Sequence, residues 1–332
     1  MTDRAVDSPP TSVPGRSLQF ASRPARNTGD RAFGAIGVAS ACVLALALVG
    51  VAASVTQLAW HSIVRFGPSF VGTREWDPVH ETFGALSFLF GTIVTSLVAM
   101  LLAVPIGLGV ALFLTDLGPR LLRRPVAMLV ELLAAIPSVV YGLWAALALA
   151  PLLRTTVQPA LADRAGFLPF FRGQPHGLGL LCASLVLAIM VLPTIASIAR
   201  EVLAAVPSEL REGGLALGAT RWDVVRRIVI PHARSGIGGA ILLGFGRAVG
   251  ETMAVATVVG SKAQITASLF APGYTMSSVI ANEFPTAAGD LHRAALAEVG
   301  LLLFVVTLLF NVGARVLVKR TAKAKPSREA RA

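Results

Sequence analysis

Charged side chains are scarce in this sequence. They make up 14% of its 332 residues, whereas 55% of the residues are hydrophobic, and a soluble domain carries roughly a quarter charged residues. The hydrophobic residues also gather in runs that are too long for soluble helices, because about 20 apolar residues are enough for a helix to cross a bilayer core of about 30 Å. The composition therefore predicts an all-α membrane protein.

Several chemical motifs are missing as well. Cys42 and Cys182 are the two cysteines, both lie inside apolar runs without a CxxC spacing, and we interpret them as small buried hydrophobic residues. The sequence has no GxxxxGK[ST] loop, so it should not hydrolyse ATP. We expect no cofactor, no metal and no enzymatic activity. The five histidines form no triad and are all expected at the surface: His61, His80, His176, His232 and His292.

Apolar runs of membrane-spanning length occur six times. They cover residues 33–58, 86–114, 126–149, 178–199, 237–260 and 295–318. Pro105, Pro137 and Pro193 lie inside the second, third and fourth runs and are expected to kink those helices. The sequence thus predicts about six transmembrane helices.

Basic residues are unevenly distributed between these runs. With a cytoplasmic N-terminus, the inside segments hold 21 Lys and Arg and the outside segments hold 7, and cytoplasmic loops are enriched in these residues. We therefore expect both termini in the cytoplasm. The asymmetry also accounts for the net charge of +11 by contact with anionic membrane lipid, without nucleic acid.

The ends of the chain differ in composition from its middle. Residues 1–31 are rich in Pro, Ser and Arg, which predicts a disordered cytoplasmic tail, and residues 319–332 form a short basic tail. Residues 32–318 are expected to form one transmembrane domain, with its core at 85–318. The proline-containing stretch 151–177 is expected to be an irregular external loop.

The stretch 208–231 carries the most informative local pattern. Ser208 is expected to cap a first short helix, Gly218 to end it in a left-handed conformation, and Thr220 to cap a second helix. Pro231 is expected to stop that second helix. Because the hairpin lies between two membrane spans, docking of a cytoplasmic partner explains it better than DNA binding.

The same stretch resembles the EAA loop of ABC importer permeases, EAA-x3-G-x9-I-x-L-P. The residues at the pattern positions are Glu212, Gly213, Gly214, Gly218, Ile228, Ile230 and Pro231. Glycine replaces both alanines, and isoleucine replaces the leucine. The resemblance implies the bundle of a type I ABC importer permease. It also implies that 208–231 is the coupling helix, which fits a groove on a separate ATP-binding subunit.

Three further stretches resemble the phosphate-specific permeases of these importers. They are the run from EWDPV through FGTIVTSLVAMLLAVPIGLGVALFL, then VELLAAIPSVVYGLW at 130–144 and GRAVGETMAV at 246–255. The sister permease of the same importers shares the RAxGET core but differs in the residues after this core. Together with the hairpin, the resemblance covers about residues 75–318.

The resemblance implies a permease subunit of an ATP-driven phosphate importer in the bacterial inner membrane. The implied partners are a homologous permease, a dimer of cytoplasmic ATP-binding subunits, an extracytoplasmic phosphate-binding protein and inorganic phosphate. A sulfate or molybdate permease and the sister phosphate permease are alternatives in the same class. A membrane-embedded enzyme is a rival from another class, but it would need a catalytic constellation in the spans, and this sequence has none there. A receptor that senses phosphate without moving it is a further alternative.

Arg247 and Glu251 are charges within the fifth apolar run. Arg247 lies ten residues beyond Ile237, about 15 Å along a helix with a rise of 1.5 Å per residue, and so near the middle of the membrane. Glu251 is predicted to lie on the same helical face and to neutralise it. The pair is either a structural link between helices or a substrate contact, since a guanidinium binds phosphate oxygens bidentately.

Other features of the spans suggest helix packing. Glu131 and Glu298 lie nearer to span ends and are expected to snorkel or to pair. Glycines are frequent around Arg247, and small residues at a spacing of four let helices approach closely. These glycines are Gly236, Gly238, Gly239, Gly244, Gly246 and Gly250. They favour a position for this helix beside the pathway and the partner permease.

Overall fold

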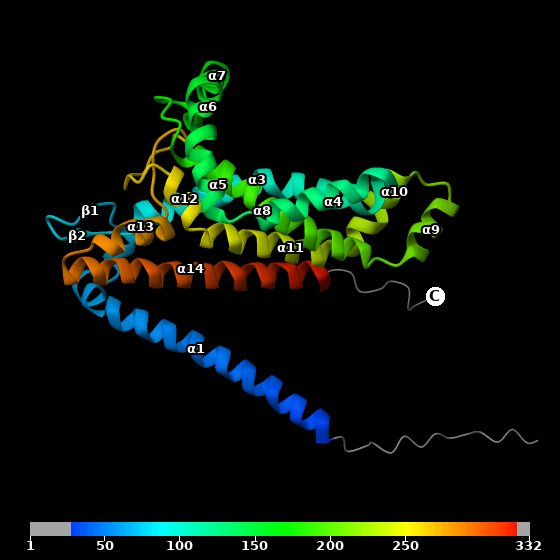
Figure 1. Cartoon of the computed structure of the whole chain (residues 1–332), viewed down its shortest axis with the longest axis horizontal. Helices are drawn as coiled ribbons and strands as arrows, with labels where there is room; N and C mark the ends of the chain where they lie inside the picture. The colour runs from blue at the N-terminus through cyan, green and yellow to red at the C-terminus, as the bar shows by residue number, and fades with distance from the viewer. Residues whose placement is uncertain (1–27, 324–332) are drawn as a thin grey trace, which may run out of the picture. The chain divides into compact units, whose positions relative to one another are not determined.

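The structure is a computed structural model that describes the backbone of residues 28–323 and the side chains of residue 29 and residues 31–316. Nearly all regular structure in it is helical (Figure 1), which confirms the predicted all-α class. Within the described residues, six helical runs are long and apolar enough to cross a membrane. These runs cover Arg31–Phe66, Leu86–Leu117, Ser138–Ala165, Leu180–Ala204, Arg221–Gly250 and Asp290–Val316.

Two units can be distinguished, one up to Val51 and one from Ala52 onward. The first contains the N-terminal part of α1 (Thr28–Phe66), whose described side chains up to Val51 are all exposed. Since α1 begins at Thr28, residues 28–31 of the predicted tail are helical. The rest of that tail, residues 1–27, lies outside the described residues.

The second unit starts with the rest of α1, residues 52–66, and short elements follow it. They are α2 (Ser69–Gly72) and an antiparallel pair of strands, β1 (Trp76–Asp77) and β2 (Thr82–Phe83), with Trp76 opposite Phe83. The next helices and π-helical turns are α3 (Leu86–Leu112), η1 (Phe113–Leu117), α4 (Arg120–Ala135), α5 (Ser138–Trp144), η2 (Ala145–Leu149), α6 (Ala150–Leu152), η3 (Leu153–Val157) and α7 (Gln158–Ala165).

The remaining elements include three long helices. They are the 3-10 turn η4 (Pro169–Phe171), α8 (Leu180–Ala204), α9 (Ser208–Ala216), α10 (Arg221–Val224), the π-helical turn η5 (Val225–Val229), α11 (Ile230–Gly250), α12 (Met253–Val258), α13 (Met276–Glu283), the 3-10 turn η6 (Phe284–Thr286) and α14 (Asp290–Lys323).

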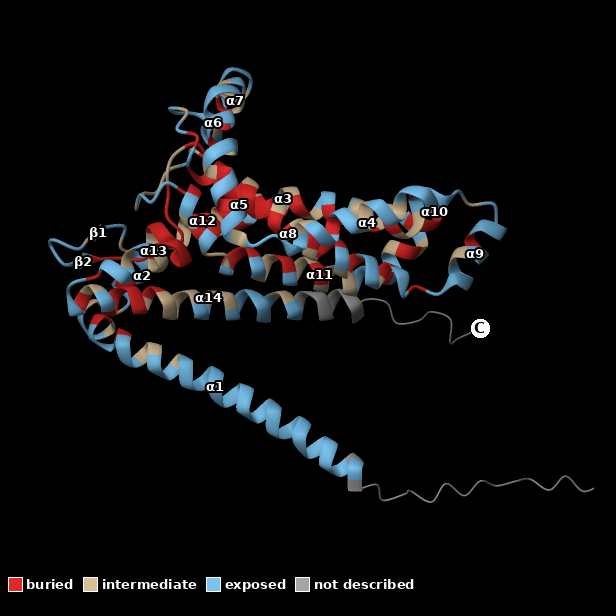
Figure 2. Cartoon of the chain, in the orientation of Figure 1, coloured by how far each residue is buried: buried red, intermediate tan, exposed pale blue. Residues whose placement is uncertain are grey.

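α8 is the central helix of the second unit. In its most apolar stretch 67% of the residues are buried, more than in any other spanning run. It packs against α3 and α11, and α11 in turn packs against α14. Buried residues concentrate on these contacts, whereas the outer faces are exposed (Figure 2). The core is thus built around one helix that has neighbours on several sides.

Small residues bring α11 close to α8. A Cβ added at Gly244 would lie 2.7 Å from the Ile195 side chain, and one added at Gly236 would overlap the Val202 side chain. Ala240, between these glycines, is fully buried. The predicted close approach of this glycine-rich helix is therefore confirmed for its contact with α8.

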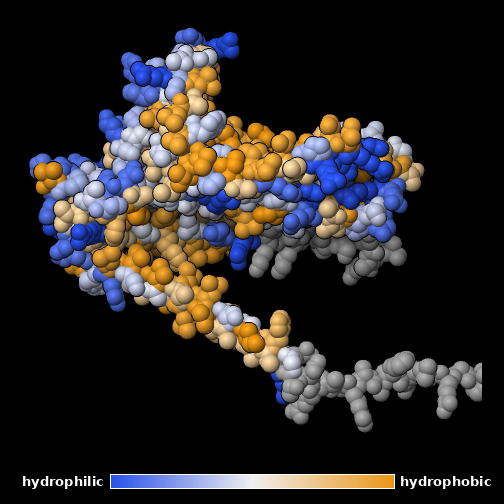
Figure 3. All heavy atoms as spheres, in the orientation of Figure 1, coloured by the Kyte–Doolittle hydropathy of each residue, from blue (hydrophilic) through white to orange (hydrophobic). Residues whose placement is uncertain are grey.

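The outer surface of the bundle is apolar over much of the visible face (Figure 3). Leu101, Leu147 and Leu309 are each more than 60% exposed. Hydrophilic residues gather instead near the α10 end and around α7 (Figure 3). An apolar flank between polar ends is what a bilayer requires, because lipid tails cover the apolar side chains at no cost.

The third predicted span needs correction. The stretch 126–149 is divided at Ile136 and Pro137, whose extended backbone separates α4 from α5. The helix then continues to Ala165, so the first half of the loop predicted at 151–177 is helical. Hydropathy did not show the division because both helices are apolar near it.

Three prolines lie inside helical runs that continue through them. Pro151, Pro159 and Pro231 each come after a π-helical turn, η2, η3 or η5, and lie two residues after its end. A proline ring clashes with the carbonyl four residues earlier and offers no N–H. The π-helical turn avoids this conflict, because its hydrogen bonds join residues five apart. The helix can then continue through a residue that the sequence alone marks as a breaker.

The strand pair is anchored by one of the histidines. His292 is mostly buried, and its Nε2 lies 3.1 Å from Glu283 Oε2, which also accepts a hydrogen bond from Trp76 Nε1 at 2.8 Å. Its predicted surface position is therefore wrong, whereas the other four histidines are not buried. In the turn between β1 and β2, a side-chain hydrogen bond between Asp77 and His80 lowers the pKa of Asp77 and raises the pKa of His80.

Two other sequence predictions have mixed outcomes. Cys182 is buried as predicted, but Cys42 is exposed on α1. Glu298 is paired, because it accepts a hydrogen bond from Ser62 at 2.6 Å. Glu131 lies on α4 rather than in the interior of a spanning run, and no hydrogen bond or ion pair connects it to the other described residues.

Gly91 tests the packing of the second unit. A Cβ at this position of α3 would overlap the Tyr274 carbonyl oxygen, whereas one at Gly109 of the same helix meets open space. We expect Gly91→Ala to lower the free energy of unfolding by about 1–3 kcal/mol through overpacking. Gly109→Ala should leave it unchanged or raise it by up to about 1 kcal/mol. Thermal unfolding in detergent micelles measures both, and equal midpoints for the two variants would contradict the described packing.

Candidate functional site

Arg247 lies in the last turn of α11, at the level of the middle of α8. Its Nη1 donates a hydrogen bond to Thr194 Oγ1 at 3.3 Å. Thr194 is ten residues before the end of α8 at Ala204, about 15 Å at 1.5 Å per residue. This contact places Arg247 at the mid-level of α8, while its own side chain is exposed.

Glu251 does not have the predicted position. α11 ends at Gly250, and Glu251 has an extended backbone (φ −69°, ψ 128°), so the fifth run is not one helix to residue 260. Its Oε1 accepts a hydrogen bond from the Ala254 backbone N–H at 3.3 Å, in the first turn of α12. Its carbonyl oxygen accepts another from Ser277 Oγ at 2.7 Å. Glu251 therefore stabilises the junction between α11 and α12.

The predicted ion pair between these two residues is wrong for this structure. Among the described residues, Arg247 has no carboxylate within salt-bridge distance. Each charge lies instead at a favourable helix end, because the C-terminus of a helix attracts a cation and an N-terminus attracts an anion. A guanidinium has five N–H donors, and the hydrogen bond to Thr194 uses a donor of one nitrogen. The remaining donors can bind an anion.

The hairpin at 208–231 folds largely as its sequence predicts. Gly218 ends α9 with φ +82°, a left-handed conformation that favours glycine. Thr220 caps α10, since its Oγ1 accepts the Asp223 N–H at 3.2 Å. Two details differ. Ser208 is the first residue of α9 and makes no capping bond, and Pro231 lies inside a continuous helix from Arg221 to Gly250. The physical reason for the second difference is the π-helical turn η5.

The residues of the EAA pattern have different surroundings in the hairpin. Gly214 is buried against the second helix of the hairpin, formed by α10 and η5, and a Cβ there would lie 2.7 Å from Ile228 Cδ1. Ile228 is half-buried. Glu212 and Gly213 are exposed, and Gly213 has open space around it. Ile228 and Gly214 thus hold the hairpin together, whereas Glu212 faces outward.

Arg211 was not identified from the sequence as a site residue. Its Nε lies 2.9 Å from Asp116 Oδ1, in a pair whose side chains are only 23% and 13% exposed. Its two other nitrogens donate to the carbonyl oxygens of Leu203 at 2.6 Å and Val206 at 3.1 Å. Arg211 thus ties α9 to the end of α8 and to η1. Because Asp116 and Arg211 are far apart in the sequence, no local pattern could have indicated the pair.

The hairpin also presents unpartnered apolar side chains. Leu217 is 91% exposed and Trp222 is 53% exposed, with Leu210 and Leu215 also among the exposed residues. Beside them is a cavity of about 600 Å³ that Glu212, Arg211 and Asp116 help to line. Exposed large apolar residues next to a polar hollow are typical of a protein interaction site.

No metal site is formed by the described side chains. Among the side chains of residue 29 and residues 31–316, no group of three or more His, Cys, Asp or Glu is placed to hold a metal ion. The arrangement consists of one exposed cation beside the middle of α8 and one hairpin at the bundle end, both connected to α8.

Comparison with known proteins identifies the class. The family model described as "Binding-protein-dependent transport system inner membrane component" matches residues 103–323. The structure is similar to a chain of a bacterial alginate ABC transporter, with a TM-score of 0.63 at 16% identity, covering 90% of this chain and 98% of that one. It also matches a chain of the MetNI methionine ABC transporter, with a TM-score of 0.52 at 20% identity, over 72% and 94% of the two chains. These two likenesses concern the fold.

Relatives with higher identity come from several bacteria. The phosphate transport system permease protein PstC of Mesorhizobium japonicum is 48% identical over 295 residues, which cover 88% of this chain and 90% of that protein. The protein of the same name from Haemophilus influenzae is 45% identical over 289 residues, or 86% and 91%. The chain belongs to the family of binding-protein-dependent transport system inner membrane components. It is thus a multi-pass inner membrane protein and a transport permease subunit.

The Arg211–Asp116 pair generates a prediction for the hairpin. Arg211→Met leaves the mostly buried Asp116 without its cation and two carbonyls without their donor, which should cost about 2 kcal/mol of local stability. Hydrogen exchange of the backbone amides at 205–220 should therefore become faster. Arg226→Met, at an exposed arginine of η5, is the matched control and should not change exchange there. Equal protection in both variants would contradict the anchoring role.

Proposed function

We propose that this chain is a permease subunit of an ATP-driven phosphate importer, in which it lines the pathway and couples it to a separate ATPase. The observation that carries the proposal is Arg247, a guanidinium that is exposed at the mid-level of α8 and has no carboxylate partner among the described residues. A cation in that position costs several kcal/mol when it is unpaired. An anionic substrate offsets this cost, and phosphate oxygens match the guanidinium fork.

The relatives support phosphate as the anion. Proteins at 45–48% identity are named phosphate transport system permeases, and this favours phosphate over sulfate or molybdate. The same names favour a PstC-like permease over the sister phosphate permease, which is PstA-like. Arg247 is the proposed substrate contact in the pathway. Glu251 is the second proposed pathway residue, and its carboxylate would limit how tightly the anion is held.

The proposed partners are inferred from the hairpin and the family. A PstB-like ATPase dimer would dock on the hairpin that Glu212, Gly213, Gly214, Gly218, Ile228 and Pro231 define. The contact would be made through its exposed residues, Glu212 and the apolar side chains of α9 and α10 among them, while Gly214 and Ile228 hold the hairpin in shape. A PstA-like permease would complete the pathway, and a PstS-like protein would deliver phosphate from outside. ATP hydrolysis belongs to the ATPase. The excess of Lys and Arg on one side favours cytoplasmic termini and a cytoplasmic hairpin.

Charge removal at Arg247 tests the substrate contact. Arg247→Gln keeps a polar side chain that can still bond to Thr194 but removes the charge and the fork. It should reduce phosphate uptake by proteoliposomes by at least about 100-fold, which corresponds to about 2.8 kcal/mol, while the complex still assembles. Glu251→Gln keeps an oxygen for the Ala254 N–H, so folding should be preserved and only turnover should change.

The double variant Arg247→Gln with Glu251→Gln separates the two roles. A structural pair would be restored by joint neutralisation, whereas a substrate contact would not. Near-normal phosphate uptake by the double variant would show that Arg247 does not bind the substrate.

The backbone of Gly218 tests the coupling role. Gly218→Val places a β-branched residue at φ +82°, which costs about 1–2 kcal/mol or more and should distort the end of α9. Insertion into the membrane should be normal, but association with the ATPase and phosphate uptake should both decrease. Gly213→Ala is the control, because alanine is the residue of the EAA pattern and its Cβ meets open space. Normal co-purification and uptake by Gly218→Val would exclude the hairpin as the coupling element.

A further inference from the structure

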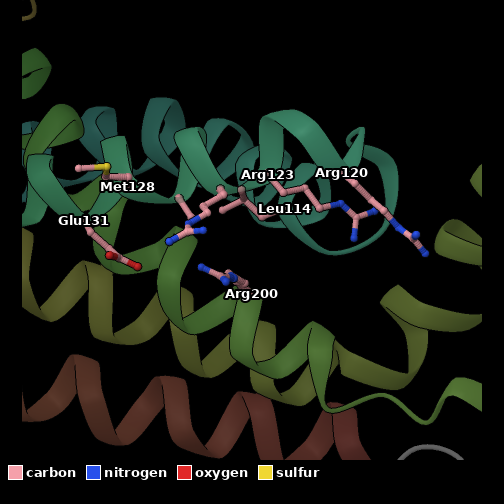
Figure 4. A pocket seen from close by; sticks show the side chains of 8 residues that line it. Leu114, Arg120, Arg123, Met128, Glu131 and Arg200 are labelled. Atoms are coloured by element: carbon pink, nitrogen blue, oxygen red, sulfur yellow. The ribbon is translucent and has the colours of Figure 1, made fainter.

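A second basic feature lies between α4 and α8. A cavity of about 530 Å³ opens there, and Figure 4 shows side chains from both helices around it. Four of the lining residues are arginines, and one is acidic. The full lining is Leu114, Arg120, Arg123, Arg124, Ala127, Met128, Glu131 and Arg200. Four guanidinium groups against one carboxylate give the cavity a strong positive charge.

Most of this charge is not neutralised by the described residues. Arg123 is held by the backbone, since its Nε donates to the Gly118 carbonyl at 2.9 Å. Arg120, Arg124 and Arg200 have neither a hydrogen bond nor an ion pair with another described residue. Like charges that share a cavity repel each other, and an anion between them removes this repulsion.

The cavity is connected to Arg247 through α8. Thr194 of α8 accepts the hydrogen bond from Arg247. Ser197 and Arg200 follow it at intervals of three residues along α8, and both are exposed. The neighbouring Ile195 and Ala199 are fully buried, so α8 has a polar side along this stretch. The distance from Thr194 to Arg200 is about 9 Å of helix. An anion that leaves Arg247 toward the hairpin end would meet Arg200 next.

We propose that the cavity between α4 and α8 is a second binding site, for a phosphoryl oxyanion. Arginine forks bind the oxygens of such groups bidentately. The cavity is large enough to hold one with several waters, at about 30 Å³ each, so the anion is partly hydrated and exchanges readily. The source is either inorganic phosphate on its way from Arg247 or the headgroup of an anionic phospholipid. The first source deepens the function proposed above, on which it rests.

Arginine labelling with phenylglyoxal tests the site residue by residue. The full-length protein, assembled in its transporter, is placed in nanodiscs of phosphatidylcholine, and the label on each arginine is quantified by mass spectrometry. Inorganic phosphate should remove most of the label from Arg124 and Arg200, compared with potassium chloride at equal ionic strength. Arg164, an exposed arginine on α7, is the internal control and should be labelled equally in both solutions.

A second set of nanodiscs distinguishes the two sources. If phosphatidylglycerol protects Arg124 and Arg200 without added phosphate, and phosphate does not protect them in phosphatidylcholine, the site holds a lipid headgroup. Protection by phosphate alone assigns it to the free anion. The proposal is overturned if neither protects these arginines, or if chloride protects them as well as phosphate does.

The Arg247→Gln variant separates this proposal from the proposed function. Its uptake should be lost, but protection of Arg124 and Arg200 by phosphate should persist, because the cavity does not include Arg247. A wild-type transporter that takes up phosphate while neither phosphate nor phosphatidylglycerol protects these arginines would refute the second site alone. A transporter that shows the protection but takes up no phosphate would refute the proposed function alone.

Discussion

The close packing of α8 against α3 and α11 is the contact on which the rest of the second unit depends. α8 is the most buried of the spanning runs in the described part of the chain. Small residues on both neighbours make room for it: Gly107 of α3 and Gly244 of α11 both face Ile195. Without this approach Arg247 could not reach Thr194, and the end of α8 could not support the hairpin. A single helix thus positions both parts of the candidate site.

In the proposed function, this arrangement offers a mechanical link between the coupling hairpin and the substrate contact. Arg211 of α9 donates to the carbonyl of Leu203 on α8, and Thr194, earlier on the same helix, accepts from Arg247. The helix segment between them is short and stiff, about 14 Å long. Movement of the hairpin by an ATPase would therefore be transmitted along α8 to the level of Arg247. The mostly buried Arg211–Asp116 pair holds the hairpin on α8, because breaking it leaves a largely desolvated charge without its partner.

The charges in the membrane region are stabilised in different ways. Glu251 is satisfied by a backbone N–H at a helix start and by its position at the junction. Arg247 is satisfied by a hydroxyl and a helix C-terminus, neither of which cancels its charge. Arg124 and Arg200 have no partner among the described residues. A chain that leaves cations in such positions is suited to bind anions, and this property connects the proposed pathway with the proposed second site.

The features predicted correctly from the sequence depend on local composition, and those that were missed depend on distant contacts. Hydropathy predicted the number of spans but misplaced the bounds of the third and the fifth. Glycine and threonine chemistry located the end of α9 and the start of α10. At Pro137 a kink was predicted, whereas the structure divides the helix there; the division was missed because apolar residues continue through it. The helix through Pro151 was missed because π-helical turns leave no sequence mark. The predicted Arg247–Glu251 pair is absent because residues four apart share a face only if the helix includes both. Here α11 ends at Gly250, one residue before Glu251.

In the proposed function, Arg247 meets the transported anion rather than a carboxylate. The most direct test is the structure of the assembled transporter determined by cryo-electron microscopy with phosphate present, inspected at the groups around the Arg247 guanidinium. The predicted result is a tetrahedral anion within hydrogen-bond distance of Arg247, with Glu251 still at the start of α12. A carboxylate paired directly with Arg247, with phosphate bound elsewhere along the pathway, would contradict it.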